Sequence, residues 1–503
     1  MLNDTLPLRS ESYSSWMTFH YTQAVLSSLL ICLGISYVYL FTGNDAAEIH
    51  TLRGFSIVNA WTFFNKRYDF LRLNFEKTGH NLFAFKVMQH KVIAISGDEA
   101  RKIFFNDSGL NSTEGNRLLR GGVPVVNDVK PDVEESNLTQ FNKLLLKILQ
   151  RERVKEAMPT LFNDIHERME DWGSEGKMSP FKDIYELVFQ MIVRMASCQE
   201  LASNPAMIRK MSDLYWKLEK SATPVGLLFP WFPGTAKKNK ENAINGLYEM
   251  LSHYVHLRRE AEVPSLDVID VLIADGMDNS SIVQFVIGVI FAGFINTGMV
   301  SSWVLVYLGT TDAWKDRATA EVQSLIAAHT NTASSEPIHR RLSAIPISAW
   351  EDEMPVAESI IRETLRIVGN ATLFRCNLSD DFRVCGKTVD KGAFMTYNLG
   401  DVHLNERFYS NPLKFDPGRF NVAGEDMNAP FLAWGVGRHP CPGMKIAKLE
   451  IKMILALVLC RYDYKLVDGS GKPAKPPQVN MNDNHQRRPL GEPCFIQYRK
   501  IAE

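Results

Sequence analysis

Two long charge-free stretches stand out in the pattern of hydrophobic and polar positions along the chain. The first runs from Ala24 to Phe41. As an α-helix it would be about 27 Å long at about 1.5 Å per residue, close to the roughly 30 Å hydrocarbon core of a bilayer. It follows a long polar stretch, whereas a secretory signal has a short basic start and a small-residue cleavage site. We therefore predict an N-terminal tail at 1–23 and one transmembrane anchor helix at 24–41, with a buried core helix as the alternative.

The second stretch, Ser281 to Gly309, is almost wholly apolar but carries Asn296, Thr297 and two serines in its middle. A helix that is apolar all round lies either in a membrane or at the centre of a large core. The polar residues grouped at mid-helix favour the core, with that group facing a cavity. A second membrane span is the alternative.

The remaining pattern predicts a mainly α-helical domain with a minor β-sheet region, extending over 45–503 without a dividing linker. Phe83 to Gly97 alternates and is rich in β-branched residues, which indicates a strand or hairpin, and Asp98 is a candidate N-cap of the helix that follows. Asn106 to Asp132 is rich in Gly, Asn and Ser, which predicts a long surface loop. A further β-rich region is expected from Thr372 to Met395.

Composition and charge exclude several classes of function. The chain has 503 residues, of which 45% are hydrophobic, so it can bury a large core. Its formal net charge is −1, which gives no basic excess for binding nucleic acid. Seven cysteines are dispersed without Cys-x-x-Cys spacing, so neither a disulfide scaffold nor a zinc site is expected.

One of these cysteines, Cys441, stands in a distinctive setting. Gly435 and Gly437 precede it and permit a tight backbone turn, while Pro442 and Gly443 follow it and lead into a strongly helical segment. We expect the sulfur to lie at a helix N-terminus, where backbone N–H groups and the helix dipole lower the pKa of a thiol. A thiolate of this kind is suited to a soft or redox-active iron site.

The segment WGVGRHPCPG resembles the haem-binding loop of cytochromes P450, in which an aromatic residue and two glycines precede the Cys and a Gly follows it. The resemblance implies a haem cofactor with Cys441 as the axial iron ligand, and with Gly435 and Gly443 among the cofactor-binding positions. His439 occupies the place where the family often has an Arg that contacts a haem propionate. Arg438 beside it is expected to share this role.

Two further motifs of the family follow in the expected order. ETLR supplies Glu363 and Arg366, which share one helix face, and FDPGRF supplies Arg419 as the third member of the family's supporting network. The resemblance assigns these three residues to folding and support of the haem site. Arg375 stands where the family often has a propionate-binding Arg, with an exposed strand Arg as the alternative.

Within the long apolar helix, GFINTG resembles the family's oxygen-activation motif. Thr297 holds the place of the family's Thr, and Asn296 replaces the usual acid. We expect the Thr297 hydroxyl to bond back to the carbonyl of Gly293 and to help deliver a proton, while Asn296 can orient water but cannot supply a proton. The resemblance implies a monooxygenase, and Asn296 motivates the alternative of a haem-thiolate isomerase or dehydratase that works without O2.

The chain contains neither a dinucleotide fingerprint nor a flavin module, so electrons must come from another protein. The resemblance implies a membrane-bound NADPH–cytochrome P450 reductase. Lys445, Lys448 and Lys452 recur at helical spacing and predict a basic stripe for docking it, with an ordinary solvated helix face as the alternative.

The substrate is expected to be a large hydrophobic molecule of secondary metabolism, with a sterol or terpenoid skeleton as the first candidate. Phe291, Phe294 and Ile295 are expected to wall its cavity. Pro224 to Lys240 combines an apolar tip with lysines, which suits a membrane interface; a loop packed on the core is the alternative. Together with the anchor, this predicts a single-pass protein of the endoplasmic reticulum whose catalytic domain faces the cytoplasm.

Overall fold

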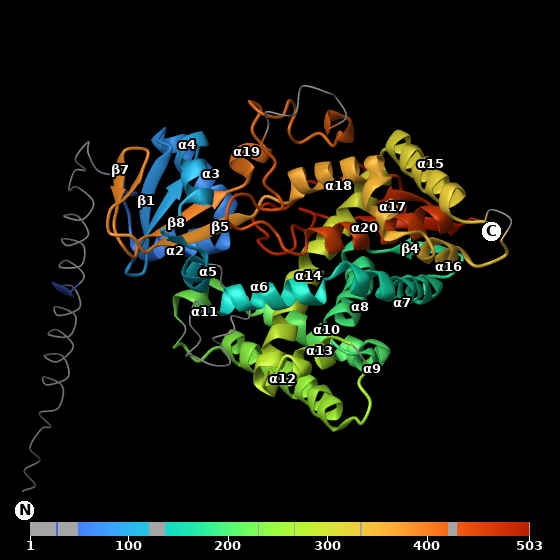
Figure 1. The fold of residues 1–503 in the computed structure, drawn as a ribbon. Coiled ribbons are helices and arrows are strands. Elements are labelled where there is room, and N and C mark those ends of the chain that lie inside the picture. Colours follow the sequence, from blue (N-terminus) through green and yellow to red (C-terminus); the bar gives the residue numbers. More distant parts are fainter. Residues whose placement is uncertain are drawn as a thin grey trace, which may run out of the picture.

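The computed structural model describes residues 27–28, 49–119, 136–229, 231–265, 267–331, 334–420 and 430–501. Most of these residues are helical, and a smaller part forms strands (Figure 1). The helices are α2 (Ser56–Asn65), α3 (Arg67–Thr78), α4 (Asp98–Asn106), α5 (Ser112–Leu119), α6 (Ser136–Ile148), α7 (Arg151–Glu170), π-helix η2 (Pro180–Ile184), α8 (Tyr185–Ala196), α9 (Gln199–Ala202), α10 (Pro205–Lys220), α11 (Pro224–Leu228), α12 (Thr235–Glu260), α13 (Val268–Ala274), α14 (Asn279–Leu308), α15 (Asp312–His329), α16 (Ile338–Ser343), α17 (Ile347–Asp352), α18 (Pro355–Val368), α19 (Gly400–His403), 3-10 helix η3 (Pro417–Phe420) and α20 (Met444–Arg461).

The strands form one larger sheet and two small ones. They are β1 (Leu82–Val87), β2 (His90–Ile95), β3 (Leu110–Asn111), β4 (Glu175–Met178), β5 (Thr372–Asn377), β6 (Phe382–Val384), β7 (Lys387–Val389), β8 (Phe394–Asn398), β9 (Tyr462–Val467) and β10 (Phe495–Lys500). The larger sheet has the order β1-β2-β8-β5-β3, the second β4-β10-β9, and the third β6-β7. In Figure 1 the larger sheet and helices α2 to α4 lie together at one side of the molecule, and the long helices fill the other. The predicted mainly α-helical fold with a minor β-sheet region is confirmed for the described residues.

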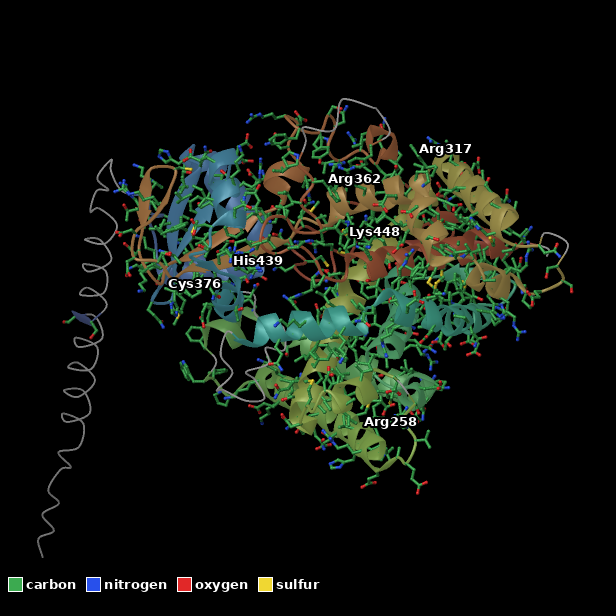
Figure 2. All side chains as sticks on the ribbon, viewed as in Figure 1. Arg258, Arg317, Arg362, Cys376, His439 and Lys448 are labelled. Atoms are coloured by element: carbon green, nitrogen blue, oxygen red, sulfur yellow. The ribbon has the colours of Figure 1, made fainter. Side chains whose placement is uncertain are left out.

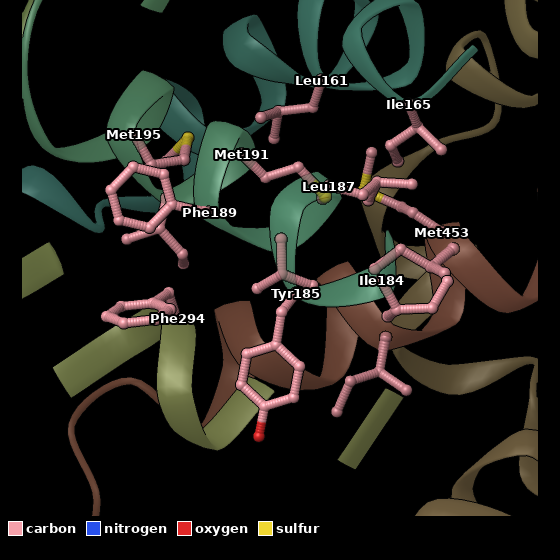
Figure 3. Close-up of a cluster of buried hydrophobic side chains, with 14 of the residues drawn as sticks. Leu161, Ile165, Ile184, Tyr185, Leu187, Phe189, Met191, Met195, Phe294 and Met453 are labelled. Atoms are coloured by element: carbon pink, nitrogen blue, oxygen red, sulfur yellow. The ribbon is translucent and has the colours of Figure 1, made fainter. Parts of the chain in front are cut away.

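Helix α14 is the central element of the helical part. It is the one described helix that is long and apolar enough to cross a membrane, yet most of its residues are buried against α8, α12, α18 and α20. The predicted core position is therefore confirmed. Figure 3 shows Phe294 of α14 packed beside Phe189 in the cluster of α8 side chains, with the two ring centroids 5.1 Å apart.

Several local predictions need correction. The helix after the β1–β2 hairpin begins at Asp98, so its N-cap is Gly97, and Asp98 pairs instead with Arg101 one turn on at 3.0 Å. The segment from residue 106 to 132, which we predicted to be one loop, contains strand β3 and helix α5. The strand ends at Asn111, and the helix begins directly after it at Ser112. The predicted anchor at 24–41 lies outside the described residues apart from 27–28.

Candidate active site

Cys441 lies in a turn immediately before α20. Its backbone N–H donates to the carbonyl of Trp434 at 2.7 Å, which closes the loop that carries it. Gly435 and Gly437 have positive φ angles of 72° and 64°, and a Cβ at Gly437 would clash with the carbonyl oxygen of Phe105. These glycines therefore let the loop fold tightly and pack on the end of α4. We expected Pro442 to lie in the first turn of the helix, but the helix begins two residues later, at Met444.

Cys441 is an exposed residue, and the backbone N–H of Gly443 donates a hydrogen bond to its thiol. Burial of the surrounding loop raises the pKa of the Cys441 thiol, and the Gly443 N–H lowers it by less. The expectation that the helix N-terminus alone lowers this pKa is therefore wrong, because one backbone donor does not outweigh desolvation. A coordinating metal ion deprotonates a thiol outright, so bound iron would hold Cys441 as a thiolate.

Three nitrogen-bearing side chains gather beside this loop: Arg375, Arg438 and His439. Arg375 is buried on β5 with its guanidinium 4.9 Å above the ring of Phe104, and it makes no ion pair with a described carboxylate. Arg438 is exposed and equally lacks a carboxylate partner among the described residues. Burial, Arg375 and Arg438 lower the pKa of His439, so this ring is neutral near pH 7 and the two arginines carry the charge. In Figure 2, His439 lies where the strands meet the helices.

This arrangement fits a haem-type cofactor. A buried arginine without a carboxylate partner is costly unless an anion neutralises it, and haem propionates are such anions. Burial lowers the pKa of Arg375 only to about 10, so the side chain remains cationic at neutral pH. A Cβ added at Gly443 would have one atom of the described residues within 4 Å, Ile446 Cγ2 at 3.9 Å, so the protein leaves open space beside the sulfur. The exposed alternative predicted for Arg375 is wrong.

The polar middle of helix α14 is partly exposed. Ala292 and Asn296 are exposed although they lie inside the most apolar helix, and Thr297 is 3% exposed. Asn296 Nδ2 donates to the carbonyl of Ala292 at 2.9 Å. The Thr297 hydroxyl makes no hydrogen bond with a described residue, so the expected bond to Gly293 is not formed. The hydroxyl is therefore available to another acceptor or donor.

Phe291, Phe294 and Ile295 are all buried in the core cluster that α14 shares with α8 and α10. Their expected place in the wall of a substrate cavity stays a prediction.

The three predicted support residues form one buried network. Arg366 on α18 donates two hydrogen bonds of 2.8 Å to the carboxylate of Glu363, and Arg419 Nε donates to the same carboxylate at 3.0 Å. Both Glu363 and Arg366 have 0% exposed surface. Because the carboxylate is shared by α18 and η3, the network fixes these elements together.

The network reaches the Cys441 loop through a residue that the sequence did not reveal. Arg366 Nη1 donates to the carbonyl of His403 at 2.6 Å, and the N–H of Leu432, at the start of the loop, donates to His403 Nε2 at 2.9 Å. Burial and the nearby Arg366 lower the pKa of His403 to about 3, which keeps the ring neutral and Nε2 able to accept. His403 stands within the unremarkable stretch DVHLN, so no local signal could have identified it.

The predicted basic stripe on α20 is largely absent. Lys445 is exposed, but Lys452 is 2% exposed and donates to the carbonyl of Trp350 at 2.8 Å. Lys448, labelled in Figure 2, pairs with Glu358 of α18, which also lies 3.8 Å from Lys452. Two of the three charges are therefore compensated inside the fold, because α20 packs against α18 along this face.

A cysteine turn, two arginines beside it without a carboxylate partner among the described residues, and a buried supporting network are the features expected of a haem-thiolate protein. Comparison with known proteins agrees: residues 54–487 match the family model described as cytochrome P450. This match covers most of the chain, and the chain therefore belongs to the cytochrome P450 family.

Two of the proteins that the chain resembles are Aspergillus proteins named as monooxygenases. The chain is 28% identical to "Cytochrome P450 monooxygenase nsrP" of Aspergillus novofumigatus, over 82% of this chain and 81% of the relative. It is 26% identical to "Cytochrome P450 monooxygenase AacuE" of Aspergillus aculeatus, over 83% of this chain and 86% of the relative. These similarities support a cytochrome P450 monooxygenase, and the family implies a thiolate-ligated haem.

The fold agrees with a solved structure. A retinoic acid-bound cyanobacterial protein, CYP120A1, superimposes with a TM-score of 0.71 over 91% of this chain and 100% of that chain, at 18% sequence identity. At this identity the likeness concerns the fold alone.

Proposed function

We propose that this cytochrome P450 monooxygenase oxidises a large hydrophobic intermediate of secondary metabolism, such as a sterol-like or terpenoid molecule, with electrons from NADPH–cytochrome P450 reductase. The observation that carries the proposal is the exposed residue Cys441 beside two arginines that lack carboxylate partners among the described residues. A similarity to a sterol 14-demethylase of Arabidopsis thaliana, 24% identical over 79% of this chain, supports the sterol-like substrate class. The alternative of a redox-neutral isomerase or dehydratase is not favoured by these relatives, which are named monooxygenases.

In this proposal each residue has a defined task. Cys441 ligates the iron of haem, which supplies O2 activation when it is bound. Arg375 and Arg438 neutralise the propionates, and His439 adds a neutral hydrogen-bond donor. Thr297 Oγ would hold the proton that the oxygen chemistry supplied by bound haem requires, and the Asn296 amide would orient the water that returns a proton to Thr297. The test is product formation from a candidate terpenoid with isotopically labelled O2, NADPH and reductase: the label enters the product only if the protein is an oxygenase.

Thr297→Ala is expected to uncouple the reaction. NADPH consumption continues, but the yield of product per NADPH falls by roughly tenfold or more. The reason is that proton delivery by a general acid accelerates a reaction by about 100-fold or more, and the variant loses this contribution. The yield of product and of hydrogen peroxide per NADPH measures this. Ser302→Ala on the same helix is the control, since Ser302 Oγ is engaged with the carbonyls of Gly298 and Pro180 and should leave coupling unchanged. Wild-type coupling in Thr297→Ala would remove Thr297 from proton delivery.

The same proposal places the protein at the endoplasmic reticulum membrane, with the predicted anchor at 24–41 and a second contact on the catalytic domain. Helix α11 lies against α2. We define an apolar face by the exposed side chains of Val58 and Trp61 on α2, of Phe55 just before it, and of Trp231 and Phe232, which follow α11. Trp231 is 71% exposed, while Leu228 one turn earlier is buried in the core, so the segment both packs on the domain and presents an apolar tip. Aromatic side chains of this kind favour the bilayer interface.

We expect protein lacking residues 1–41 to retain vesicle binding through the apolar face. Trp231→Asp with Phe232→Asp should weaken this binding by tenfold or more, because burial of each large apolar side chain is worth about 1.5–3 kcal/mol. Co-flotation with phospholipid vesicles is the measurement. Leu413→Asp is the matched control, since Leu413 is also 71% exposed but lies between α19 and η3. Equal flotation of all variants would exclude the second contact.

A further inference from the structure

Helix α14 is packed along most of its surface and opens at one place. Two of its 30 residues are exposed, Ala292 and Asn296. Its glycines on either side of them are covered by α8: a Cβ added at Gly293 or Gly298 would meet α8 side chains at 2.9 and 2.8 Å. Figure 3 shows Phe294, on a packed side of the helix, beside the side chains of α8. A ligand that approaches α14 can therefore reach it at Ala292 and Asn296.

These two residues form one small window in the apolar helix. Residues four positions apart share a helix face, so the Ala292 methyl group and the Asn296 amide are neighbours. Asn296 Nδ2 donates to the backbone carbonyl of Ala292 at 2.9 Å. Because a carbonyl oxygen can only accept, this bond determines which end of the amide is the nitrogen. The helix itself therefore orients the Asn296 side chain.

The Asn296 amide retains polar groups for a ligand after this bond is made. Its Oδ1 forms no hydrogen bond with any residue that the structure describes, and its nitrogen carries a second N–H. The window therefore offers an acceptor and a donor close together. A ligand that covers the window excludes water from both groups, and a polar group that is left unpaired on burial disfavours binding. The ligand that fits best pairs with both of them.

A hydroxyl group is the complement of such an amide. It can donate to Oδ1 and accept from the remaining N–H, whereas a carbonyl or ether oxygen only accepts and a hydrocarbon does neither. We infer that the window formed by Ala292 and Asn296 binds a hydroxyl group of the substrate. This inference rests on the proposed function, in which the substrate reacts beside this part of α14.

The hydroxyl group also places the reaction in a sequence of reactions. The large hydrophobic substrate is already an alcohol when it binds, so a hydroxylation or the reduction of a carbonyl group must supply it. Without such a ligand, a water molecule takes the same place, because water has the donors and acceptors of a hydroxyl group. The water that Asn296 orients in the proposed function and the substrate hydroxyl therefore use the same two groups of the amide.

The inference is tested by titrating the full-length, haem-loaded protein with three probes of similar shape. 1-Adamantanol donates and accepts, 1-methoxyadamantane only accepts, and 1-methyladamantane does neither; the spin-state shift of the haem iron gives each Kd. Asn296→Leu should raise the Kd of 1-adamantanol about three- to tenfold relative to that of 1-methyladamantane, as expected for a hydrogen bond between neutral groups. Gln284→Leu is the control, because Gln284 carries an amide on the same helix but is 9% exposed and donates to Ser280.

The ratio of the two Kd values within each variant decides the outcome. An unchanged ratio in Asn296→Leu, or an equal change in Gln284→Leu, would overturn the inference, as would a wild-type protein that does not bind 1-adamantanol. An equal effect on 1-methoxyadamantane would show that the amide acts only as a donor, which removes the need for a hydroxyl group. The carbon monoxide spectrum of each variant is recorded first, so that a missing haem-thiolate site, which contradicts the proposed function, is distinguished from a missing contact at Asn296.

Discussion

Cys441→Ala is expected to abolish the thiolate-type carbon monoxide difference spectrum and, with it, monooxygenase turnover. The reason is electronic: the sulfur anion pushes electron density onto the iron, and an alanine leaves that position to water or to no ligand. A loss of roughly 1,000-fold or more in turnover corresponds to about 4 kcal/mol of transition-state stabilisation. The measurement is the difference spectrum of the reduced protein, together with product formation at matched haem content.

A second cysteine, on the helix that follows the Cys441 turn, provides the control. Cys460 is half-buried near the end of α20, and burial raises the pKa of its thiol to about 12, so it stays protonated. Cys460→Ala should keep the thiolate-type spectrum and lose little stability. If the haem-loaded Cys441→Ala protein instead keeps the wild-type iron spectrum, Cys441 is not the ligand and the proposed chemistry is wrong.

The sequence predicted the site best where the residues that form it are close to one another in the chain. The glycines, proline and following apolar helix around Cys441 belong to one short segment, so their spacing alone predicted a turn before a helix. Glu363 and Arg366 are likewise one turn apart, which fixes their mutual geometry once the helix forms. The polar middle of α14 correctly indicated a core helix, whereas the cavity that its polar residues were expected to face stays a prediction.

The predictions that were wrong, and the residue that was missed, depend on contacts between segments that are distant in the sequence. The spacing of Lys448 and Lys452 in the sequence predicts a solvated stripe. In the folded protein, Glu358 of another helix lies against both lysines. The pKa of the Cys441 thiol could not be predicted from the helix dipole, since the desolvation that raises it comes from the whole folded loop. His403 acts through its backbone carbonyl and one ring nitrogen, and neither role leaves a pattern in the sequence.

Arg366→Leu is expected to lower the free energy of unfolding by about 3–5 kcal/mol, because it leaves the Glu363 carboxylate charged and fully buried. Arg419 and the N–H of Asp416 still donate to that carboxylate at 3.0 Å, so the loss should lie toward the lower end of this range. Urea unfolding followed by circular dichroism measures it. Arg72→Leu is the matched control: Arg72 pairs with Glu76 on the surface, and such pairs contribute about 1 kcal/mol or less.

The double variant Glu363→Leu/Arg366→Leu separates stability from support of the haem site. Removing both charges should recover part of the lost stability, since an uncompensated buried charge costs more than its replacement by an apolar pair. Haem retention should not recover, because the carbonyl of His403 still lacks its donor and the contact from His403 to Leu432 is no longer held in place. Full recovery of haem binding together with stability would show that the network acts only on folding, and that the Cys441 loop is positioned without it.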